Sequence, residues 1–138
     1  MQQAQTLFTV NTRGKGLHEI TREVARWVEG SGIATGLLSL LCRHTSAGLL
    51  IMENAAPAVR RDIERWLSTA APEGAAYEHD DEGPDDMPAH IRTMLTGATL
   101  SIPVAEGRLL LGTWQGLFLA EHRAAPHRRT IAAHLIGE

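Results

Sequence analysis

The segment 77–90 gathers the residues of this chain that are best suited to binding a metal ion. It reads YEHDDEGPDDMPAH and holds six acidic residues, two of the seven histidines and no lysine or arginine. Imidazole and carboxylate groups together suit a divalent transition metal, and zinc is the first candidate. His79 and His90 lie eleven positions apart, so Gly83-Pro84 would have to bend the loop back on itself. No short ligand motif such as H-E-x-x-H is present, and spacing alone therefore favours a solvated acidic loop.

A second group, His44-Thr45-Ser46, follows an apolar run, where functional side chains are common. If the extended geometry continues, His44 and Ser46 share one face and Thr45 points the other way. A Ser–His nucleophile pair can be drawn, but side chains two positions apart on a strand run parallel and seldom meet well for proton transfer. From these residues alone, polar groups that end a strand are the favoured interpretation.

A third group, Gly112-Thr113-Trp114-Gln115-Gly116, interrupts an apolar stretch. Glycines inside a strand often mark a bulge or the close approach of a ligand. Trp114 suits a core, whereas a buried Gln115 amide needs hydrogen-bond partners. Glu121 lies on the same face as Gln115 but roughly 20 Å away, at about 3.3 Å per residue. One small ligand can touch both only across a bulge or at a site shared between subunits, which points to an oligomer.

Arginines near the C-terminus are candidates for binding a phosphate. Arg128 and Arg129, with Arg123 nearby, have the planar guanidinium that suits bidentate anion contacts. The segment 13–16 precedes an expected helix but lacks the spacing of a Walker loop. Solvated surface charge is the favoured interpretation for both groups. Cys42 lies in an apolar run and is expected to be core.

Expected helices and strands alternate in the first part of the chain, and the last part is expected to be mainly strands. A helix is expected with Leu17, Ile20, Val24, Trp27 and Val28 on one face, ended by 30–32. Another helix follows Asn54, its expected cap, and a short helix opens at Pro88. The expected strands are 6–11, 33–43, 49–52, 99–104, 108–120 and 129–136. This order predicts an α+β fold, a mostly antiparallel sheet or sandwich with two to three helices.

Length and composition set the limits on function. The chain has 138 residues, of which 43% are hydrophobic and 21% charged, which predicts one compact domain over 1–138. No apolar run approaches the roughly 20 residues of a membrane span. The net charge of -3 and the lack of a basic stripe argue against general nucleic-acid binding. With one cysteine and no signal-like N-terminus, we expect a cytoplasmic protein.

Taken together, the motifs resemble the YjbQ-like family, also called the secondary thiamine-phosphate synthase family. The similarity runs in order from about Thr12 to the C-terminus, and the G-T-W-Q element is its most specific part. The motifs that carry it are His44-Thr45-Ser46-Ala47, Glu53-Asn54, Tyr77-Glu78-His79, Pro88-Ala89-His90-Ile91, the 107–116 stretch and Glu121.

The resemblance implies a small α+β homotrimer with sites near the subunit interfaces. It implies a divalent metal, zinc first, held by His44, His79 and His90. The implied activity joins a hydroxymethylpyrimidine diphosphate to a thiazole phosphate and releases pyrophosphate, as a weak or side activity. On that basis the substrate is a small phosphorylated molecule.

The predicted roles follow from the resemblance. Arg129 would stabilise charge and Gln115 would orient the substrate, so the expected catalytic residues are Gln115, Glu121 and Arg129. Substrate contacts are expected from Thr45, Ser46, Asn54 and Trp114. The rival interpretation is a non-catalytic trimer that binds a metal or a small anion. A hydrolase that uses metal-bound water ranks third.

Overall fold

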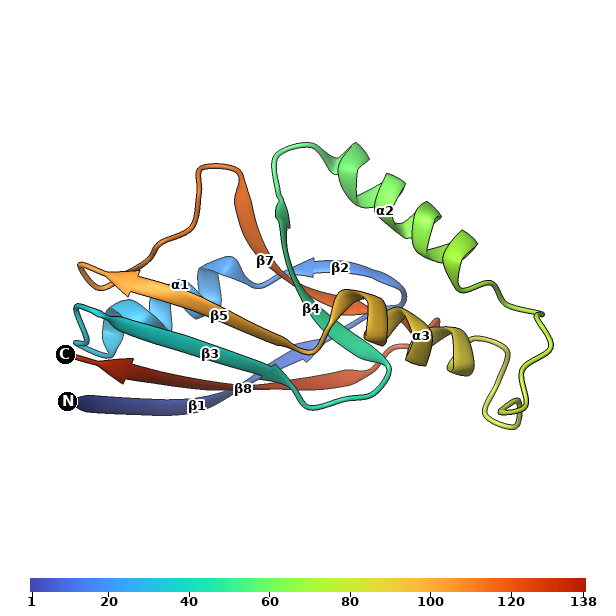
Figure 1. Cartoon of the computed structure of the whole chain (residues 1–138), viewed down its shortest axis with the longest axis horizontal. Coiled ribbons are helices and arrows are strands. Elements are labelled where there is room, and N and C mark those ends of the chain that lie inside the picture. Colours follow the sequence, from blue (N-terminus) through green and yellow to red (C-terminus); the bar gives the residue numbers. More distant parts are fainter.

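The computed structural model describes all 138 residues as two antiparallel sheets and three helices (Figure 1). The larger sheet has the strand order β1-β8-β3-β5-β6, and the smaller has the order β2-β7-β4. The strands are β1 (Gln2–Asn11), β2 (Gly16–Glu19), β3 (Gly36–Cys42), β4 (Ala47–Glu53), β5 (Thr99–Ala105), β6 (Arg108–Leu109), β7 (Gln115–Glu121) and β8 (Arg128–Gly137). The helices are α1 (Thr21–Gly30), α2 (Pro57–Ala70) and α3 (Asp86–Thr96). The predicted α+β class is confirmed.

The larger sheet is built from strands whose side chains alternate between a buried and an open face. Leu38, Leu40, Ile131 and Leu135 point into the core and are at most 2% exposed. They meet in register because β3 and β8 pair along their whole common length. Strict period-two burial fixes this register, since a one-residue slip would turn every one of these side chains to the other face.

The smaller sheet is centred on β7, which is buried on both faces. Its residues Leu117 to Ala120 are each 0% exposed, so the strand is a continuous apolar run instead of an alternating one. Helix α1 closes the core with Val24 and Val28. The Ile20 N–H donates to the Leu117 carbonyl and anchors the start of α1 to β7.

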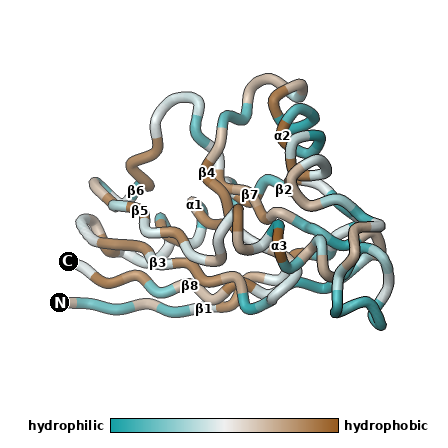
Figure 2. The backbone as a smooth tube through the Cα atoms, turned by 45° about the vertical axis from the view of Figure 1, so that its right-hand side comes forward, coloured by the Kyte–Doolittle hydropathy of each residue, from teal (hydrophilic) through white to brown (hydrophobic).

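The outer face of the larger sheet carries apolar side chains at the surface. Leu7, Leu37 and Leu41 are 56%, 43% and 45% exposed, and Ile136 is 38% exposed. Hydrophobic segments of β3 and β8 are visible along this sheet in Figure 2. None of the three helices has the length and apolar character that a membrane span requires.

Three predicted elements need correction. Leu17 lies in β2 and not on the first helix, because the chain pairs with β7 before α1 begins. Asn54 does not cap α2, since its amide donates to Glu19 Oε2 and the cap position is Ala56. The expected strand 108–120 is split into β6 and β7, with 110–114 as a connection between the two sheets. Gly112 therefore lies in a loop and not in a strand interior.

Four chain segments meet at one end of the molecule. Glu121 ends β7 opposite Ala47 in β4, and Arg129 lies near the start of β8. The connection 43–46 and the start of α3 reach the same end (Figure 1). This meeting of segments from distant parts of the sequence positions the candidate site.

His122, directly after β7, is a buried histidine held in its neutral form. It is 1% exposed; its Nε2 lies 3.2 Å from Thr96 Oγ1 and its Nδ1 has no partner. Burial, assisted by the charge of Arg92, lowers the pKa of His122 to about 4. The unfolded chain therefore binds one proton more than the native protein between about pH 4 and pH 6.5.

We predict that this difference destabilises the protein as the pH falls through that window. The lowered pKa corresponds to a loss of about 3 kcal/mol of unfolding free energy, complete only near pH 4. Urea unfolding of wild type and His122→Gln, from pH 7 to pH 4 at one protein concentration, measures it. The stability gap between the two proteins should narrow towards low pH. Parallel curves would contradict the prediction.

Candidate metal centre

Helix α3 begins two residues before the predicted Pro88, and this places Asp86 in its first turn. Asp86 and His90 are four positions apart, so both side chains lie on one face of α3. His90 Nε2 lies 3.1 Å from Asp86 Oδ2. Asp86 is 3% exposed, although it starts a helix at the edge of the molecule.

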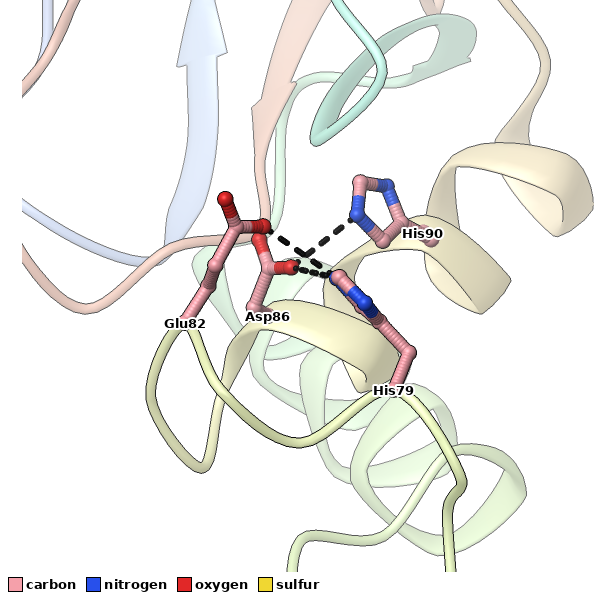
Figure 3. Close-up of side chains that lie close together, drawn as sticks. All are labelled: His79, Glu82, Asp86 and His90. Atoms are coloured by element: carbon pink, nitrogen blue, oxygen red, sulfur yellow. Dashed lines mark hydrogen bonds and ion pairs between the residues drawn. The ribbon is translucent and has the colours of Figure 1, made fainter.

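The acidic loop brings two further ligands to the same carboxylate. His79 Nε2 lies 2.9 Å from Asp86 Oδ2 and 3.2 Å from Glu82 Oε2. Gly83 has a φ of 98°, which a residue with a side chain rarely adopts, and this lets the loop reverse direction. One ligand atom from each of His79, Glu82, Asp86 and His90 lies within 4.8 Å of the others (Figure 3). We call these four residues the His/Asp cluster.

Arg123 holds the acidic loop against the end of β7. Its guanidinium donates to Asp86 Oδ1 at 2.7 Å, to Asp85 Oδ2 at 3.1 Å and to the Glu82 carbonyl at 3.1 Å. The Ala124 N–H also donates to Asp85. Arg123 therefore occupies one oxygen of Asp86 and leaves the other facing the two imidazoles.

The tautomer of His90 is set by the backbone. His90 Nδ1 lies 2.8 Å from the Thr45 carbonyl, which can only accept, so Nδ1 carries the proton. In the neutral ring Nε2 then has a lone pair and points it at the Asp86 carboxylate. Histidine ligands of metals are held in this way, with the far ring nitrogen donating to a carbonyl or carboxylate. The cluster therefore fits a divalent cation. The cation would lie between the Nε2 lone pair of His90 and the carboxylate oxygens of Asp86 and Glu82, which otherwise face one another.

The charges of the cluster support this arrangement. Burial opposes ionisation of Asp86, but His79, His90 and Arg123 hold its pKa below the ordinary value. The hydrogen bond to Asp86, followed by that to Glu82, raises the pKa of His79. In the absence of metal, the carboxylates of Asp86 and Glu82 favour a proton on His79, and a metal ion would compete with this proton.

A buried ion pair lies beside the cluster. Glu121 is 0% exposed and receives four hydrogen bonds. Two come from Arg129 Nε and Nη2 at 2.8 and 2.6 Å, one from the Thr12 hydroxyl, and one from the Arg123 N–H. Burial acts against the charge of Glu121, but Arg129 and Thr12 hold its pKa below the ordinary value. Glu121 is thus an ionised group that orients Arg129.

The connection 43–46 lies between the two groups. The Thr45 carbonyl accepts from His90, and Arg129 Nη2 donates to the Ser46 carbonyl and hydroxyl. His44 is outside the His/Asp cluster, because its Nε2 accepts from the Thr130 N–H at 2.8 Å and its Nδ1 faces Arg129. Arg129 therefore contacts both His44 and Ser46, and no hydrogen bond joins these two residues.

The remaining predicted residues lie at the opposite end of β7. Gln115 starts that strand, and its Oε1 accepts from the Gly112 N–H. Trp114 is 63% exposed, so it is not a core residue. Asn54 lies next to this group through the bond from its N–H to the Trp114 carbonyl. The register of β7 with β4 has no bulge, so Gln115 and Glu121 stay at opposite ends of the strand.

The sequence was compared with protein-family models and with known proteins, and both comparisons find the same family. The family model described as UPF0047 protein YjbQ-like matches residues 6–138. The chain belongs to the YjbQ-like family. Among its relatives, the UPF0047 protein YjbQ of Salmonella typhimurium is 48% identical over 135 residues, covering 97% of this chain and 98% of that protein. A UPF0047 protein of Synechocystis is 47% identical over 138 residues, covering 99% of this chain and 94% of the other.

Solved structures show the same fold. A hypothetical protein from Aeropyrum pernix K1 matches with a TM-score of 0.89 at 29% identity, covering 98% of this chain and 99% of the other. A YjbQ/UPF0047 protein from Clostridium acetobutylicum matches with a TM-score of 0.88 at 35% identity, covering 95% and 99%. Homology to the YjbQ-like family thus establishes the fold of this chain.

Sequence reasoning did not single out Asp86 and Glu82 among the six acidic residues, and it treated Arg123 only as a member of a basic group. The four-residue spacing of Asp86 and His90 was the available signal, but it depends on α3 beginning before Pro88. No local pattern indicates that Arg123 crosses to the acidic loop, because the two segments are about 37 residues apart.

We predict that the Arg129–Glu121 pair is a strongly coupled structural unit of this YjbQ-like protein. Arg129→Met should lower the unfolding free energy by about 3–5 kcal/mol, because it leaves a buried carboxylate without its partner. Glu121→Gln combined with Arg129→Met should cost less than the two single changes added together. Urea unfolding of the four proteins at one concentration measures this coupling. Strictly additive losses would contradict it.

Proposed function

We propose that this protein binds one divalent metal ion, zinc first, through His79, Glu82, Asp86 and His90, and acts on a small phosphorylated molecule. The observation that supports this proposal most strongly is that the imidazoles of His79 and His90 and the carboxylate of Glu82 all lie close to Asp86. When bound, the metal would neutralise the charge of a diphosphate leaving group or activate a water molecule. The proposal uses two of the three histidines that the resemblance implies, and His44 takes another role.

The chain's own residues would hold the reactants. Asp86 and its partner Arg123 fix the metal-binding end of α3. Arg129, oriented by Glu121, would place positive charge beside the connection 43–46. The exposed Thr45 and the buried Ser46 would border the substrate there. The transfer that we propose, as a weak or side activity, couples a pyrimidine diphosphate to a thiazole phosphate and releases pyrophosphate.

The approach to the cluster is asymmetric in charge. On the side of His79 lies an open groove of about 650 Å³, lined by Tyr77, Glu78, His79, Asp80, Asp81 and Met87. This groove carries three carboxylates besides its histidine and no lysine or arginine, so it would repel a diphosphate. A phosphorylated substrate is therefore expected near His90 and the connection 43–46, which Arg129 contacts.

Assembly as a homotrimer is part of the proposal. Gln115, Trp114 and Asn54 lie at the far end of β7 from Glu121, roughly 20 Å away at about 3.3 Å per residue. If both groups contact one substrate, a second copy of the chain must supply one of them. We also propose a cytoplasmic location, and the free, buried Cys42 is compatible with it.

A non-catalytic metal- or anion-binding protein is the second candidate. The observation that favours it is that the Ser46 hydroxyl accepts from Arg129 and has no hydrogen bond to His44, which leaves the hydroxyl without a base to activate it. Turnover distinguishes the two functions, because both predict the same metal site.

We predict about one equivalent of zinc per chain in wild type after loading and gel filtration. Asp86→Asn and the double change His79→Ala, His90→Ala should each weaken zinc binding by at least about 100-fold, because ligands are removed outright. Competition against a colorimetric chelator measures the affinity. His134→Ala, which removes a half-buried histidine of β8, is the control and should bind zinc like wild type.

Turnover is measured with the same proteins. Zinc-loaded wild type should release pyrophosphate from the pyrimidine and thiazole substrates, and the zinc-deficient variants should not. Zinc binding without pyrophosphate release would favour the non-catalytic function. Equal zinc affinity in wild type and Asp86→Asn would contradict the metal site itself.

A further inference from the structure

Arg129 has one terminal nitrogen that its buried surroundings do not satisfy. Nε and Nη2 donate to Glu121, and Nη2 also donates to the carbonyl and hydroxyl of Ser46. Nη1 has only His44 Nδ1 within reach, at 3.4 Å. Arg129 is 4% exposed, so an unused N–H group here is costly and calls for an acceptor.

His44 cannot be that acceptor. The Thr130 N–H donates to His44 Nε2 at 2.8 Å, and a backbone N–H has no acceptor capacity. Nε2 therefore carries the lone pair of the neutral ring, and the proton is on Nδ1. Burial, followed by the charge of Arg129, lowers the pKa of His44 and keeps the ring neutral near pH 7. The Nδ1–H and the Arg129 Nη1–H groups are thus two donors that face the same space.

We infer that His44 Nδ1–H and Arg129 Nη1 together bind an oxyanion, the phosphoryl or carboxylate group of a small molecule. Two donor nitrogens 3.4 Å apart can both donate to one oxygen or to neighbouring oxygens of one group. Hydrogen bonds from a charged donor to an oxyanion are among the strong ones in proteins. Both donors are fixed in advance, Arg129 by Glu121 and His44 by the Thr130 N–H.

The surroundings suit a negative ligand that arrives from solvent. Glu121 neutralises Arg129, but the exposed Arg43 acts on His44 with a further positive charge. His44 is half-buried and Thr45 beside it is exposed, so a small anion would approach the buried Arg129 past His44. The acidic groove beside His79 has the opposite charge, and neither His44 nor Arg129 lines it.

This inference deepens the proposed function. It rests on that function for the identity of the substrate to which the bound oxyanion belongs. It assigns His44 to the phosphate end of the substrate and not to the metal. The binding itself depends only on the donors of His44 and Arg129, so it is testable in the absence of metal.

The test is a titration of metal-free, ¹⁵N-labelled protein with inorganic phosphate at pH 7 and constant ionic strength. Imidazole ¹⁵N spectra should show His44 as the Nδ1–H tautomer before any addition. Phosphate should then shift the His44 Nδ1 and Arg129 side-chain signals along one saturable curve. A parallel titration with acetate tells which oxyanion is bound more tightly, and hence whether the site prefers a phosphoryl or a carboxylate group.

Variants separate this site from the metal centre. His44→Phe should weaken phosphate binding at least tenfold, whereas His44→Asn, which can place an amide N–H near the position of Nδ1, should recover most of it. His18→Phe, a change of another histidine, should bind like wild type. His79→Ala, which removes a proposed zinc ligand that hydrogen-bonds only to Glu82 and Asp86, should also keep phosphate affinity within twofold.

Three results would overturn the inference. The first is an Nε2–H tautomer at His44, because Nδ1 would then accept from Arg129. The second is the absence of a saturable shift with either anion. The third is anion binding that survives His44→Phe or requires zinc. Failure of zinc binding with intact phosphate binding would instead refute the metal centre and leave the oxyanion site standing.

Discussion

The buried carboxylate of Asp86 is the group on which the candidate site depends. Arg123 takes one of its oxygens, while His79 and His90 face the other. A carboxylate at 3% exposure is unstable without such partners, which come from the acidic loop, from α3 itself and from the residues after β7. Satisfying Asp86 therefore folds the acidic loop back, joins α3 to the end of β7 and brings the two imidazoles together.

A second constraint connects this cluster to the sheets. Arg123 donates from its side chain to Asp86 and from its backbone N–H to Glu121. Glu121 in turn orients Arg129, and the connection 43–46 receives bonds from both His90 and Arg129. The proposed metal ligands and the proposed anion-binding donors are therefore parts of one hydrogen-bonded network. Such an arrangement fits a site that binds a metal and a phosphorylated molecule side by side.

The sequence predicts most of the fold because burial leaves a periodic trace. Alternation in β8 and the continuous apolar run of β7 indicate their strands, and the α+β class follows from their order. The prediction is wrong where tertiary contacts override local patterns. Leu17 has helical spacing but pairs with β7, and Asn54, a plausible cap, donates to Glu19 instead.

The site was less predictable than the fold. Composition marks the acidic segment, but not which carboxylate is buried, since that choice depends on Arg123 from a distant segment. His79 and His90 lie together around Asp86, whereas His44 contacts the Thr130 N–H and Arg129. Zinc K-edge X-ray absorption of the loaded protein tests this account most directly. The account predicts two imidazole nitrogens and carboxylate oxygens around the metal. A third imidazole, or sulfur from Cys42, would contradict it.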